Sequence, residues 1–379
     1  MEGAPALENT AEANGLGAED ASPSRILDIG YAFLRSKALL SAVELDVFTI
    51  LAEGPQHLDS LVGRVGIHER GARDFFDALV ALGLLYRDEK DRYGNSADCD
   101  RYLDRRKPSY LGELLTHLNA RHYQNWGSLT RALRTVAPQS KELGLGSYRA
   151  LYDDRPTQEI FLNGMTAGSL LAAQALAKEF PWRDYRTVID IGTAQGCLPV
   201  EIFLVHPHLT GGGFDLPAIE PTFMSYIRKH GLSDRLQFYP GDFFSDPLPE
   251  ADVHVMGRIL HNWDLPTKTM LLANAHQALP VGGALIVYDP LIDDGRRVQA
   301  HALLSSLNML IETAGGFEYT AAQCREWMRH VGFRDIRTQP LDDVHTAVIG
   351  IKGGRLATRS APGTNRLTVG GQSMSALPR

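Results

Sequence analysis

The sequence predicts an α/β chain of two parts, a mostly helical module followed by an open, mostly parallel sheet. Two observations lead to this fold class. From residue 186 onward, short apolar runs typical of strands alternate with helix-like stretches, the order expected for parallel strands joined by crossover helices. Before that point, apolar residues recur at i, i+3 and i+4 spacing, beginning in 25–51, as they do on one broad face of a helix.

The first segment of the chain has no sequence pattern that predicts a packed structure. Residues 1–24 are rich in Ala, Glu, Gly, Asn and Pro without a periodic apolar pattern, and we expect a disordered tail. Residues 25–105 then match a winged-helix pattern, with helices followed by LYRDEKDRYGNS as a two-stranded wing. The second helix mixes arginine with aspartate, whereas a helix that reads DNA shows a clustered basic face. A dimerisation module is therefore favoured over a DNA-binding one.

Residues 106–180 are predicted to be helices that connect the two parts. Tyr123 and Trp126 fall on one face of such a helix. Most aromatic stripes of this kind pack in a core, and some line a pocket for a flat substrate. Residues 181–353 form the predicted sheet domain, with strands at VIDIG, GGGFDL, LQFYPGDFF, DVHVMGRIL, GALIVYDPLI and HTAVIGIK, and 354–379 form a second disordered tail.

The glycine turn after the first strand predicts a bound nucleoside cofactor. In VIDIGTAQG the strand runs into Gly192 and an apolar helix follows, so that helix amides face a ligand. Asp215 lies 23 residues after Gly192, where a carboxylate accepts both hydrogen bonds of a ribose diol. The turn lacks the middle glycine of a dinucleotide fingerprint, and Asp190 would repel a pyrophosphate but attract a cation. These features favour S-adenosylmethionine over NAD; an ordinary strand–helix turn is the alternative.

Two further strand ends carry candidate site residues. In GDFF, Asp242 is placed to accept a hydrogen bond from an adenine amino group and Phe243 to pack on the ring, although a β-turn with a core Phe explains the pattern equally well. His261 follows the fourth strand at the same edge of the sheet. Imidazole titrates near neutral pH, so this side chain can take a proton from a hydroxyl. Asp289 and Glu318 are the acids that we expect to orient it.

Composition argues against several classes of function. The 379 residues carry a net charge of −7 without a basic block, which speaks against nucleic acid or an anionic membrane as the partner. Three cysteines without paired spacing fit a reducing cytoplasm and predict neither a disulfide framework nor a zinc site. The sequence also shows no uninterrupted apolar run of membrane-span length and no signal-like N-terminus.

The motifs form an ordered set. AVELDVFTIL, VIDIGTAQG, FDLP, GDFF, LHNWD and GGFEYTAAQCREWMRHVGF occur in this order, and 28 residues separate His261 from Asp289. Over about residues 25–352 the chain resembles the two-domain, S-adenosylmethionine-dependent O-methyltransferases related to plant caffeate and acetylserotonin O-methyltransferases and to bacterial polyketide and phenazine methyltransferases. The resemblance implies a Rossmann-like methyltransferase domain behind a winged-helix dimerisation domain, and hence a cytoplasmic homodimer that acts on a small molecule.

The resemblance also implies roles for individual residues. His261 matches the catalytic base of the family, and Asp289 and Glu318 match the two acids that flank it. Cofactor-binding residues are then expected at Ser169, Asp190, Gly192, Asp215, Leu216, Asp242 and Phe243. A substrate pocket is expected at Tyr123, Trp126, Phe161, Met165, Asn308 and Met309, without a metal ion in the site.

The chain departs from the family's pattern at three places. Thr193 and Ala194 replace two glycines of the cofactor turn. Gly257 stands where plant members often have a lysine, with Arg258 next to it, so that this cofactor contact does not carry over. Asp289 replaces a glutamate of some relatives, which shortens its reach to the histidine by one methylene.

The expected function is methylation of a hydroxyl on a small aromatic secondary metabolite of phenolic or polyketide type. Three alternatives stay open at this point: an NAD-dependent dehydrogenase, a ligand-responsive winged-helix DNA-binding regulator, and a methyltransferase-like enzyme that binds the cofactor but catalyses decarboxylation or hydroxylation. The retained His261 with its two candidate acids favours methylation. A carboxyl, amine or enol acceptor is compatible with the same sequence.

Overall fold

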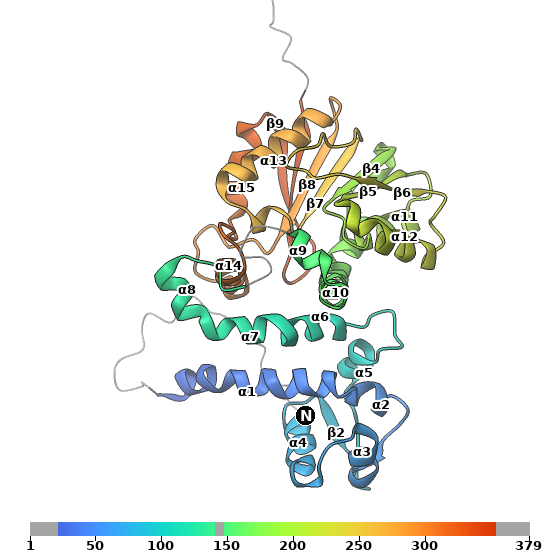
Figure 1. The fold of residues 1–379 in the computed structure, drawn as a ribbon, viewed down its shortest axis with the longest axis vertical. Helices are drawn as coiled ribbons and strands as arrows, with labels where there is room; N and C mark the ends of the chain where they lie inside the picture. Colours follow the sequence, from blue (N-terminus) through green and yellow to red (C-terminus); the bar gives the residue numbers. More distant parts are fainter. Residues whose placement is uncertain (1–21, 141–147, 354–379) are drawn as a thin grey trace, which may run out of the picture.

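The computed structural model describes residues 22–140 and 148–353 (Figure 1). The predicted tail 354–379 lies outside the described residues, and so does most of the predicted tail 1–24. The end of the first tail is described, and helix α1 already begins at Ser24. In Figure 1 the N-terminal domain is at the bottom, a layer of connecting helices crosses the middle, and the α/β domain stands above it.

The N-terminal domain combines helices with a small antiparallel sheet. Strands β2 and β3 form the predicted wing, and β1, two residues long, adds a third strand in the order β1-β3-β2. Phe48, Phe76 and Tyr93 fill the core beneath these strands. The elements are α1 (Ser24–Glu44), α2 (Val47–Leu51), β1 (Gln56–His57), α3 (Leu58–Val65), α4 (Glu69–Ala81), β2 (Leu85–Arg87), β3 (Arg92–Asn95) and α5 (Ala97–Leu103).

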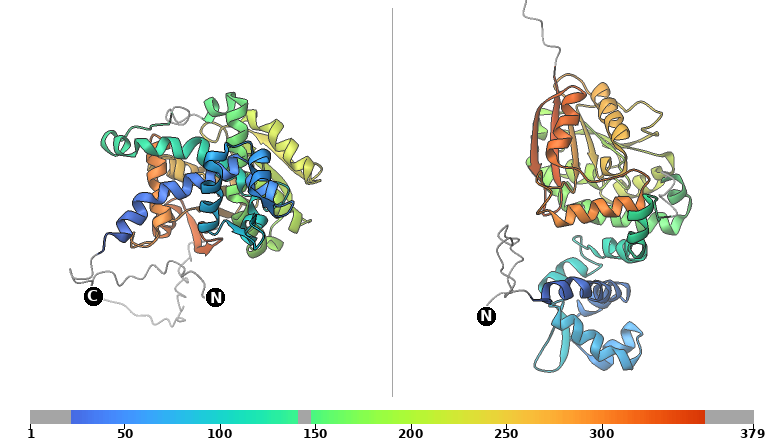
Figure 2. Two further views of the ribbon diagram at one scale, coloured as in Figure 1. Left: turned by 90° about the horizontal axis from the view of Figure 1, so that it is seen from below. Right: turned by 90° about the vertical axis from the view of Figure 1, so that its left-hand side faces the viewer.

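The middle layer joins the two domains. Helix α6 contacts α1 on one side and α10 on the other, and α14 of the α/β domain lies along the edge that faces this layer (Figure 2, right). α6 continues into a π-helical turn, η2, whose wider hydrogen-bonded loop holds one more residue than an α-turn. The elements are α6 (Gly112–His117), η2 (Leu118–His122), α7 (Tyr123–Asn125), η3 (Trp126–Ser128), α8 (Leu129–Thr135), α9 (Tyr148–Asp153) and α10 (Arg155–Glu179).

The α/β domain is built on a seven-stranded sheet in the order β6-β5-β4-β7-β8-β10-β9. The first five strands are parallel, β10 is antiparallel to β8, and β9 is antiparallel to β10, so the predicted mostly parallel sheet is confirmed. The strands are β4 (Thr187–Ile191), β5 (Thr210–Asp215), β6 (Leu236–Pro240), β7 (Val253–Gly257), β8 (Ala284–Asp289), β9 (Phe333–Pro340) and β10 (Thr346–Lys352).

Strand β9 is an edge strand that the sequence pattern did not reveal. Its sequence, FRDIRTQP, is mostly polar, and most of its side chains are exposed or half-buried. An edge strand with charged residues avoids pairing with other chains, and it lacks the apolar run by which the other strands were recognised. Two apolar residues, Phe333 and Ile336, pack on the core.

Helices cover both faces of the sheet and set up two apolar clusters. On β4, Val188 belongs to the cluster under α10, α11 and α12, while its neighbour Ile189 belongs to the cluster under α13 and α15. This alternation is the period of two of a strand buried on both faces. The remaining elements are η4 (Trp182–Asp184), α11 (Cys197–Val205), η5 (Pro217–Ile219), α12 (Glu220–Lys229), η6 (Leu260–Asn262), α13 (Leu265–Ala278), α14 (Ala300–Glu312) and α15 (Ala321–His330).

Helix α10 is the one helix in the described part of the chain that is long and apolar enough to cross a membrane by composition. Its residues Leu162, Ala172 and Leu176 are fully buried in the cluster that α10 shares with α11 and the sheet. This burial is what a core helix requires, and the same composition occurs in core helices and membrane spans alike.

Candidate active site

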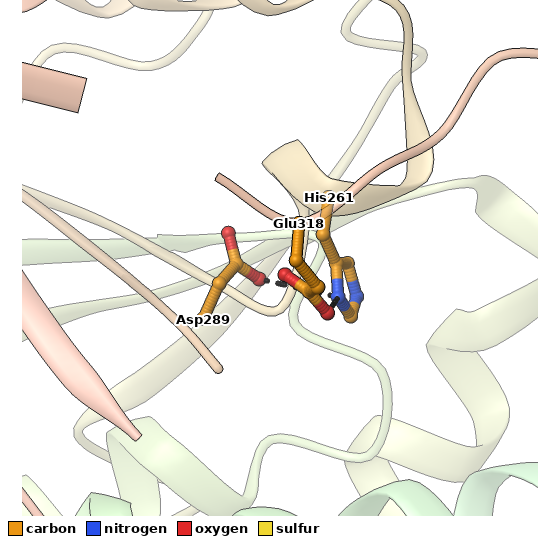
Figure 3. A group of neighbouring side chains, drawn as sticks. All are labelled: His261, Asp289 and Glu318. Carbon is orange, nitrogen blue, oxygen red and sulfur yellow. Dashed lines mark hydrogen bonds and ion pairs between the residues drawn. The ribbon is translucent and has the colours of Figure 1, made fainter. Parts of the chain in front are cut away.

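A cavity of about 510 Å³ opens at the carboxyl ends of the parallel strands. This volume is in the range of small-molecule sites. The predicted residues that line it are Trp126, Phe161, Met165, Ser169, Asp190, Gly192, Asp215, Leu216, Asp242, Phe243, His261, Asn308 and Met309. Asp289 and Glu318 do not line the cavity but contact His261 from behind (Figure 3).

The glycine turn between β4 and α11 depends on left-handed backbone. Gly192 has φ +74°, and a Cβ there would come within 2.3 Å of the Ile259 side chain. Only glycine fits this position without strain. Ala194, which replaces a glycine of the family pattern, also adopts a left-handed conformation at φ +52°. Ala194 therefore holds a left-handed conformation that glycine adopts more readily.

Asp215 is fixed at the end of β5 by two backbone amides. Its Oδ2 accepts a hydrogen bond from Ala194 N at 2.9 Å, and its Oδ1 accepts one from Leu216 N at 2.7 Å. Burial raises the pKa of Asp215 to about 6, although both amides act in the opposite direction. A carboxylate has about four acceptor sites, so each oxygen keeps capacity for a ribose hydroxyl.

Asp190 is a second buried carboxyl group in the same half of the cavity. It is 5% exposed, and burial together with the nearby charge of Asp215 raises its pKa to about 7. A bound cation would favour the ionised form, because opposite charges lower a carboxyl pKa. The site is thus suited to a ligand that is positively charged near β4.

The aromatic side chains after β6 and β7 form a cluster that lines the cavity. The rings of Phe243 and Trp263 lie 6.0 Å apart, nearly perpendicular, and Phe244 packs against both. Asp242 caps the turn by accepting a hydrogen bond from Phe244 N at 3.0 Å. Two buried carboxyl groups and an aromatic cluster along one cavity are chemically suited to the ribose, the sulfonium-bearing chain and the adenine of S-adenosylmethionine.

Arg258, directly after β7, has a strained backbone and side-chain donors without hydrogen-bond partners. Its φ of +57° is unusual for a bulky residue, and its Nε and Nη1 are buried without a hydrogen-bond partner among the described residues. A Cβ on Gly168 would lie 3.0 Å from Nη1, which places the guanidinium against α10 beside Ser169. Unpaired donors of a permanent cation in a cavity are a ready site for an oxyanion.

His261 lies in the short helix η6 and is held by an acid. Its Nδ1 is 2.7 Å from Glu318 Oε1 and 3.6 Å from Asp289 Oδ1 (Figure 3). Only the first distance is a hydrogen bond. The three side chains are at most 6% exposed. Their donor atoms lie within 4.8 Å of one another, a spacing that would also admit a metal ion, so the predicted absence of a metal needs an experiment.

Each of the two acids also accepts a hydrogen bond from a hydroxyl group. Oε1 of Glu318 also accepts a hydrogen bond from Ser305 Oγ at 2.7 Å. Oδ2 of Asp289 accepts a hydrogen bond from the Tyr319 hydroxyl, whereas its Oδ1 has no hydrogen-bond partner in the described residues. Burial alone would lower the pKa of His261, but the charges of these two acids outweigh burial and raise it above 6.5.

A buried lysine completes this charged cluster. Lys268 is 0% exposed, donates a hydrogen bond to Trp263 O, and places Nζ 3.4 Å from the centroid of the Phe317 ring. Burial lowers the pKa of Lys268 to about 8 against the attraction of Asp289 and Glu318. The sequence pattern gave no sign of it, because a lysine in a predicted amphipathic helix is usually solvated.

The acceptor half of the cavity lies between the middle layer and α14. Trp126 Nε1 donates a hydrogen bond to Asn308 Oδ1 at 2.9 Å, which links η3 to α14. Tyr123 is the exception among the predicted pocket residues: it does not line the cavity, and Lys37 of α1 lies 5.4 Å from its ring centroid. Tyr123 thus packs toward α1, as most aromatic residues of such a stripe pack in a core, and is not a pocket residue.

Sequence reasoning missed several residues that line the cavity. Besides Arg258, they include His117, His122, Tyr148 and His345. His117 and His122 come from the middle layer, where aromatic and polar residues also occur for packing, and His345 lies in the loop between β9 and β10. A signal was available only for Trp263, which belongs to the motif LHNWD.

Comparison with known proteins adds an independent line of evidence. The model of an O-methyltransferase domain matches residues 126–334, and that of an O-methyltransferase dimerisation domain matches residues 27–105. The 8-O-methyl transferase TcmO of tetracenomycin polyketide synthesis from Streptomyces glaucescens is 45% identical over 330 residues, which cover 87% of this chain and 97% of that protein.

Two further relatives extend the comparison. The N,N-dimethyltransferase OxyT from Streptomyces rimosus is 37% identical and covers 84% of this chain and 93% of its own length. The crystal structure of human N-acetylserotonin methyltransferase in complex with SAM has a TM-score of 0.81 and 28% identity, and covers 89% of this chain and all of that one. The chain therefore belongs to the S-adenosylmethionine-dependent O-methyltransferases of the acetylserotonin and caffeate type, with an N-terminal dimerisation domain, and acts on small molecules.

Proposed function

We propose that this enzyme methylates a hydroxyl group of a small aromatic acceptor, phenolic or polyketide-like, with His261 as the general base. The hydrogen bond from His261 Nδ1 to Glu318 Oε1, at 2.7 Å, carries this proposal. A carboxylate at Nδ1 holds the proton there and leaves Nε2 as the proton acceptor. The identity of 45% with a polyketide 8-O-methyl transferase supports an acceptor of this class.

The residues of the chain supply positioning and proton transfer. When bound, S-adenosylmethionine would supply an electrophilic methyl group: the acceptor oxygen would bond to the methyl carbon in line, the carbon–sulfur bond would break, and S-adenosylhomocysteine would leave as a neutral thioether. A phenol has a pKa of about 10 and is mostly protonated at neutral pH. His261 takes this proton as the oxygen attacks, and Glu318 and Asp289 stabilise the imidazolium that forms. The cavity walls hold the acceptor oxygen on the line of attack.

Four side chains would hold the cofactor in this proposal. Asp215 accepts the hydrogen bonds of the ribose diol, and Asp190 faces the cationic end of the molecule. Phe243 packs on the adenine. The unpaired donors of Arg258, next to α10, suit the carboxylate at the methionyl end. Plant members often have a lysine at the position of Gly257, and in this proposal the neighbouring Arg258 supplies the charged contact instead.

Replacement of His261 tests the proposal. We expect His261→Ala and His261→Gln to lose about 10²–10⁴-fold in kcat, the usual contribution of a general base, and to bind S-adenosylmethionine with nearly wild-type affinity. Turnover by mass spectrometry and cofactor binding by calorimetry measure the two quantities. Unchanged turnover, or loss of cofactor binding together with turnover, would contradict the assignment.

Amine methylation is the second candidate because one relative, OxyT, is an N,N-dimethyltransferase. A screen of paired aromatic acceptors, each with a hydroxyl or an amino group at the same position, separates the two. We expect the hydroxyl compounds to be methylated, and activity on the amines alone would replace the proposal. Decarboxylation or hydroxylation would appear in the same screen as products without an added methyl group.

We also propose that the enzyme is a homodimer joined through the N-terminal domain. The first half of α1 exposes an apolar face whose side chains are each at least half exposed: Ile26, Leu27, Ile29, Tyr31, Phe33 and Leu34. Such a face marks an association surface. Light scattering should give twice the chain mass for the wild type and the chain mass for Phe33→Asp. The free, buried state of all three cysteines accords with the cytoplasmic location expected from the sequence.

A further inference from the structure

The acceptor half of the cavity ends in two histidines that the proposed mechanism does not use. His117 closes α6 and His122 closes η2, and their ring centroids lie 5.0 Å apart at 73°. Both line the cavity, and His117 is only 2% exposed. Within the described residues, the ring nitrogens of His117 make no hydrogen bond, and His122 has only a long contact of 3.5 Å to Asn308 Nδ2.

The acidic neighbour of this histidine pair, Glu312, is already paired. Arg121 Nη2 donates a hydrogen bond to Glu312 Oε2 at 2.7 Å, and Asn125 donates to the other oxygen of the same carboxylate at 2.9 Å. The histidines therefore have no carboxylate to themselves. Because a buried polar group without a partner costs free energy, this end of the cavity is built to meet polar atoms of a ligand.

A row of aromatic rings leads from the reaction centre to the pair. Trp263 lies two residues after His261, and its ring centroid is 6.2 Å from that of Tyr148. Tyr148 is 6.1 Å from Phe161, and Phe161 is 5.7 Å from His117. Such a wall offers stacking contacts to a flat ligand along its whole length. A long planar acceptor held along this wall would reach the histidines.

Both histidines are neutral at physiological pH. Burial, followed by the positive charges nearby, lowers the pKa of His117 to about 3. Burial likewise lowers the pKa of His122 to about 4, although the charge of Glu312 acts in the opposite direction. A neutral imidazole has one N–H donor and one acceptor nitrogen. It therefore recognises a hydroxyl or a carbonyl oxygen and offers no charge to a carboxylate.

We propose that His117 and His122 form a distal subsite that hydrogen-bonds an oxygen substituent of the acceptor, at the end of its ring system remote from the methylated hydroxyl. This inference rests on the proposed function and narrows its substrate class to fused aromatic molecules with hydroxyl or carbonyl oxygens at both ends. His117 and His122 act as specificity residues; they take no part in the transfer of the methyl group.

Two anthraquinones of the same length test the subsite. 2-Hydroxyanthraquinone carries one terminal hydroxyl, and 2,6-dihydroxyanthraquinone carries one at each end. We expect the wild-type enzyme, saturated with S-adenosylhomocysteine, to bind the second compound more tightly by about 2- to 13-fold beyond the statistical advantage of two equivalent ends, the effect of one hydrogen bond. Calorimetry measures the ratio of the two dissociation constants.

Variants of the pair should change this ratio. His117→Phe and His122→Phe keep an aromatic ring and remove the hydrogen bonds, so the ratio should fall toward the statistical value. His122→Gln, which keeps a donor and an acceptor, should retain part of the preference and covers the case of a Phe variant that does not fold. His230→Phe, an exposed position at the end of α12, is the matched control with an unchanged ratio.

The outcomes separate this inference from the proposed function. If the wild type binds the two compounds equally, or binds neither, or if the Phe variants keep the full preference, the distal subsite is wrong even where hydroxyl methylation is observed. If the preference behaves as expected but no acceptor is methylated in the presence of S-adenosylmethionine, the proposed function fails and the subsite stands.

Discussion

Glu318 holds the imidazole of His261 directly, and Asp289 acts on it from a distance. The hydrogen bond to Glu318 measures 2.7 Å, whereas Asp289 Oδ1 lies 3.6 Å from the same nitrogen. The hydroxyl of Tyr319 holds the other oxygen of Asp289. The shorter side chain at 289 thus leaves the orienting role to Glu318, and Asp289 contributes charge.

The two acids should therefore respond unequally to removal of their charge. We expect Glu318→Gln to lower kcat by about 10²-fold, because a neutral amide no longer stabilises the imidazolium or fixes the tautomer. Asp289→Asn should have the smaller effect. Steady-state kinetics of both variants at one pH decide the order, and an Asp289 variant that is the more damaged of the two would reverse the assignment.

His261 and its two acids also set the pH dependence of turnover. His261 must be neutral to accept a proton, and the two carboxylates raise its pKa above 6.5. Activity is thus expected to fall as the pH drops through this raised value. Glu318→Gln removes part of the attraction, so the pKa of His261 falls and the acid limb of kcat/KM moves to lower pH. A limb that stays in place would mean that another group controls it.

The raised pKa of Asp215 predicts that cofactor binding depends on pH. Its pKa is raised to about 6, and the ionised form is the better acceptor for a ribose diol. Affinity for S-adenosylmethionine should therefore increase as the pH rises from 5 to 7, by titration calorimetry. Asp215→Ala should weaken binding by about 10²-fold, as expected for loss of hydrogen bonds to a charged group, and reduce this pH dependence to the part that the titration of Asp190 contributes. Unfolding temperature serves as the check on the fold.

The buried Lys268 predicts a variant with a changed pH profile and a lower stability. Lys268→Met removes a buried cation, so the pKa of Asp289, about 6 in the wild type, should rise further and the acid pair should lose charge near neutral pH. We expect a changed pH profile of kcat and a lower melting temperature, because removing one partner of a buried charge cluster leaves the remaining carboxylates without compensation. Lys268→Arg is the control that keeps the charge. A role in packing alone would leave the pH profile unmoved.

Chelation tests the absence of a metal. The donor atoms of His261, Asp289 and Glu318 are close enough to hold an ion. The predicted mechanism needs Nδ1 of the histidine for a proton, so EDTA followed by desalting should leave turnover unchanged, and added Zn²⁺ should inhibit. Loss of activity on chelation with recovery on adding one metal would assign the cluster to that metal.

The sheet domain, and the places of Gly192 and Asp215 at its strand ends, could be predicted from the sequence because they rest on local rules. A left-handed glycine after a strand, as at Gly192, and an acid at the next strand end, as at Asp215, follow from backbone geometry that short motifs record. The acceptor side was harder. Tyr123 was misplaced, and His117 was missed, because the acceptor side is built by packing between segments that are distant in the sequence. Such packing leaves no period in the sequence, and neither does the π-turn at Leu118–His122.

That π-turn has a consequence for how acceptor choice can diverge. Each residue of an α-helix advances the chain by about 100°, so deletion of one residue within Leu118–His122 would rotate everything after it and present a different set of side chains to the bound molecule. The strands, the glycine turn and the acid–imidazole pair would stay where they are. A single insertion or deletion here offers evolution, or an engineer, a way to exchange one half of the enzyme's recognition without disturbing its chemistry.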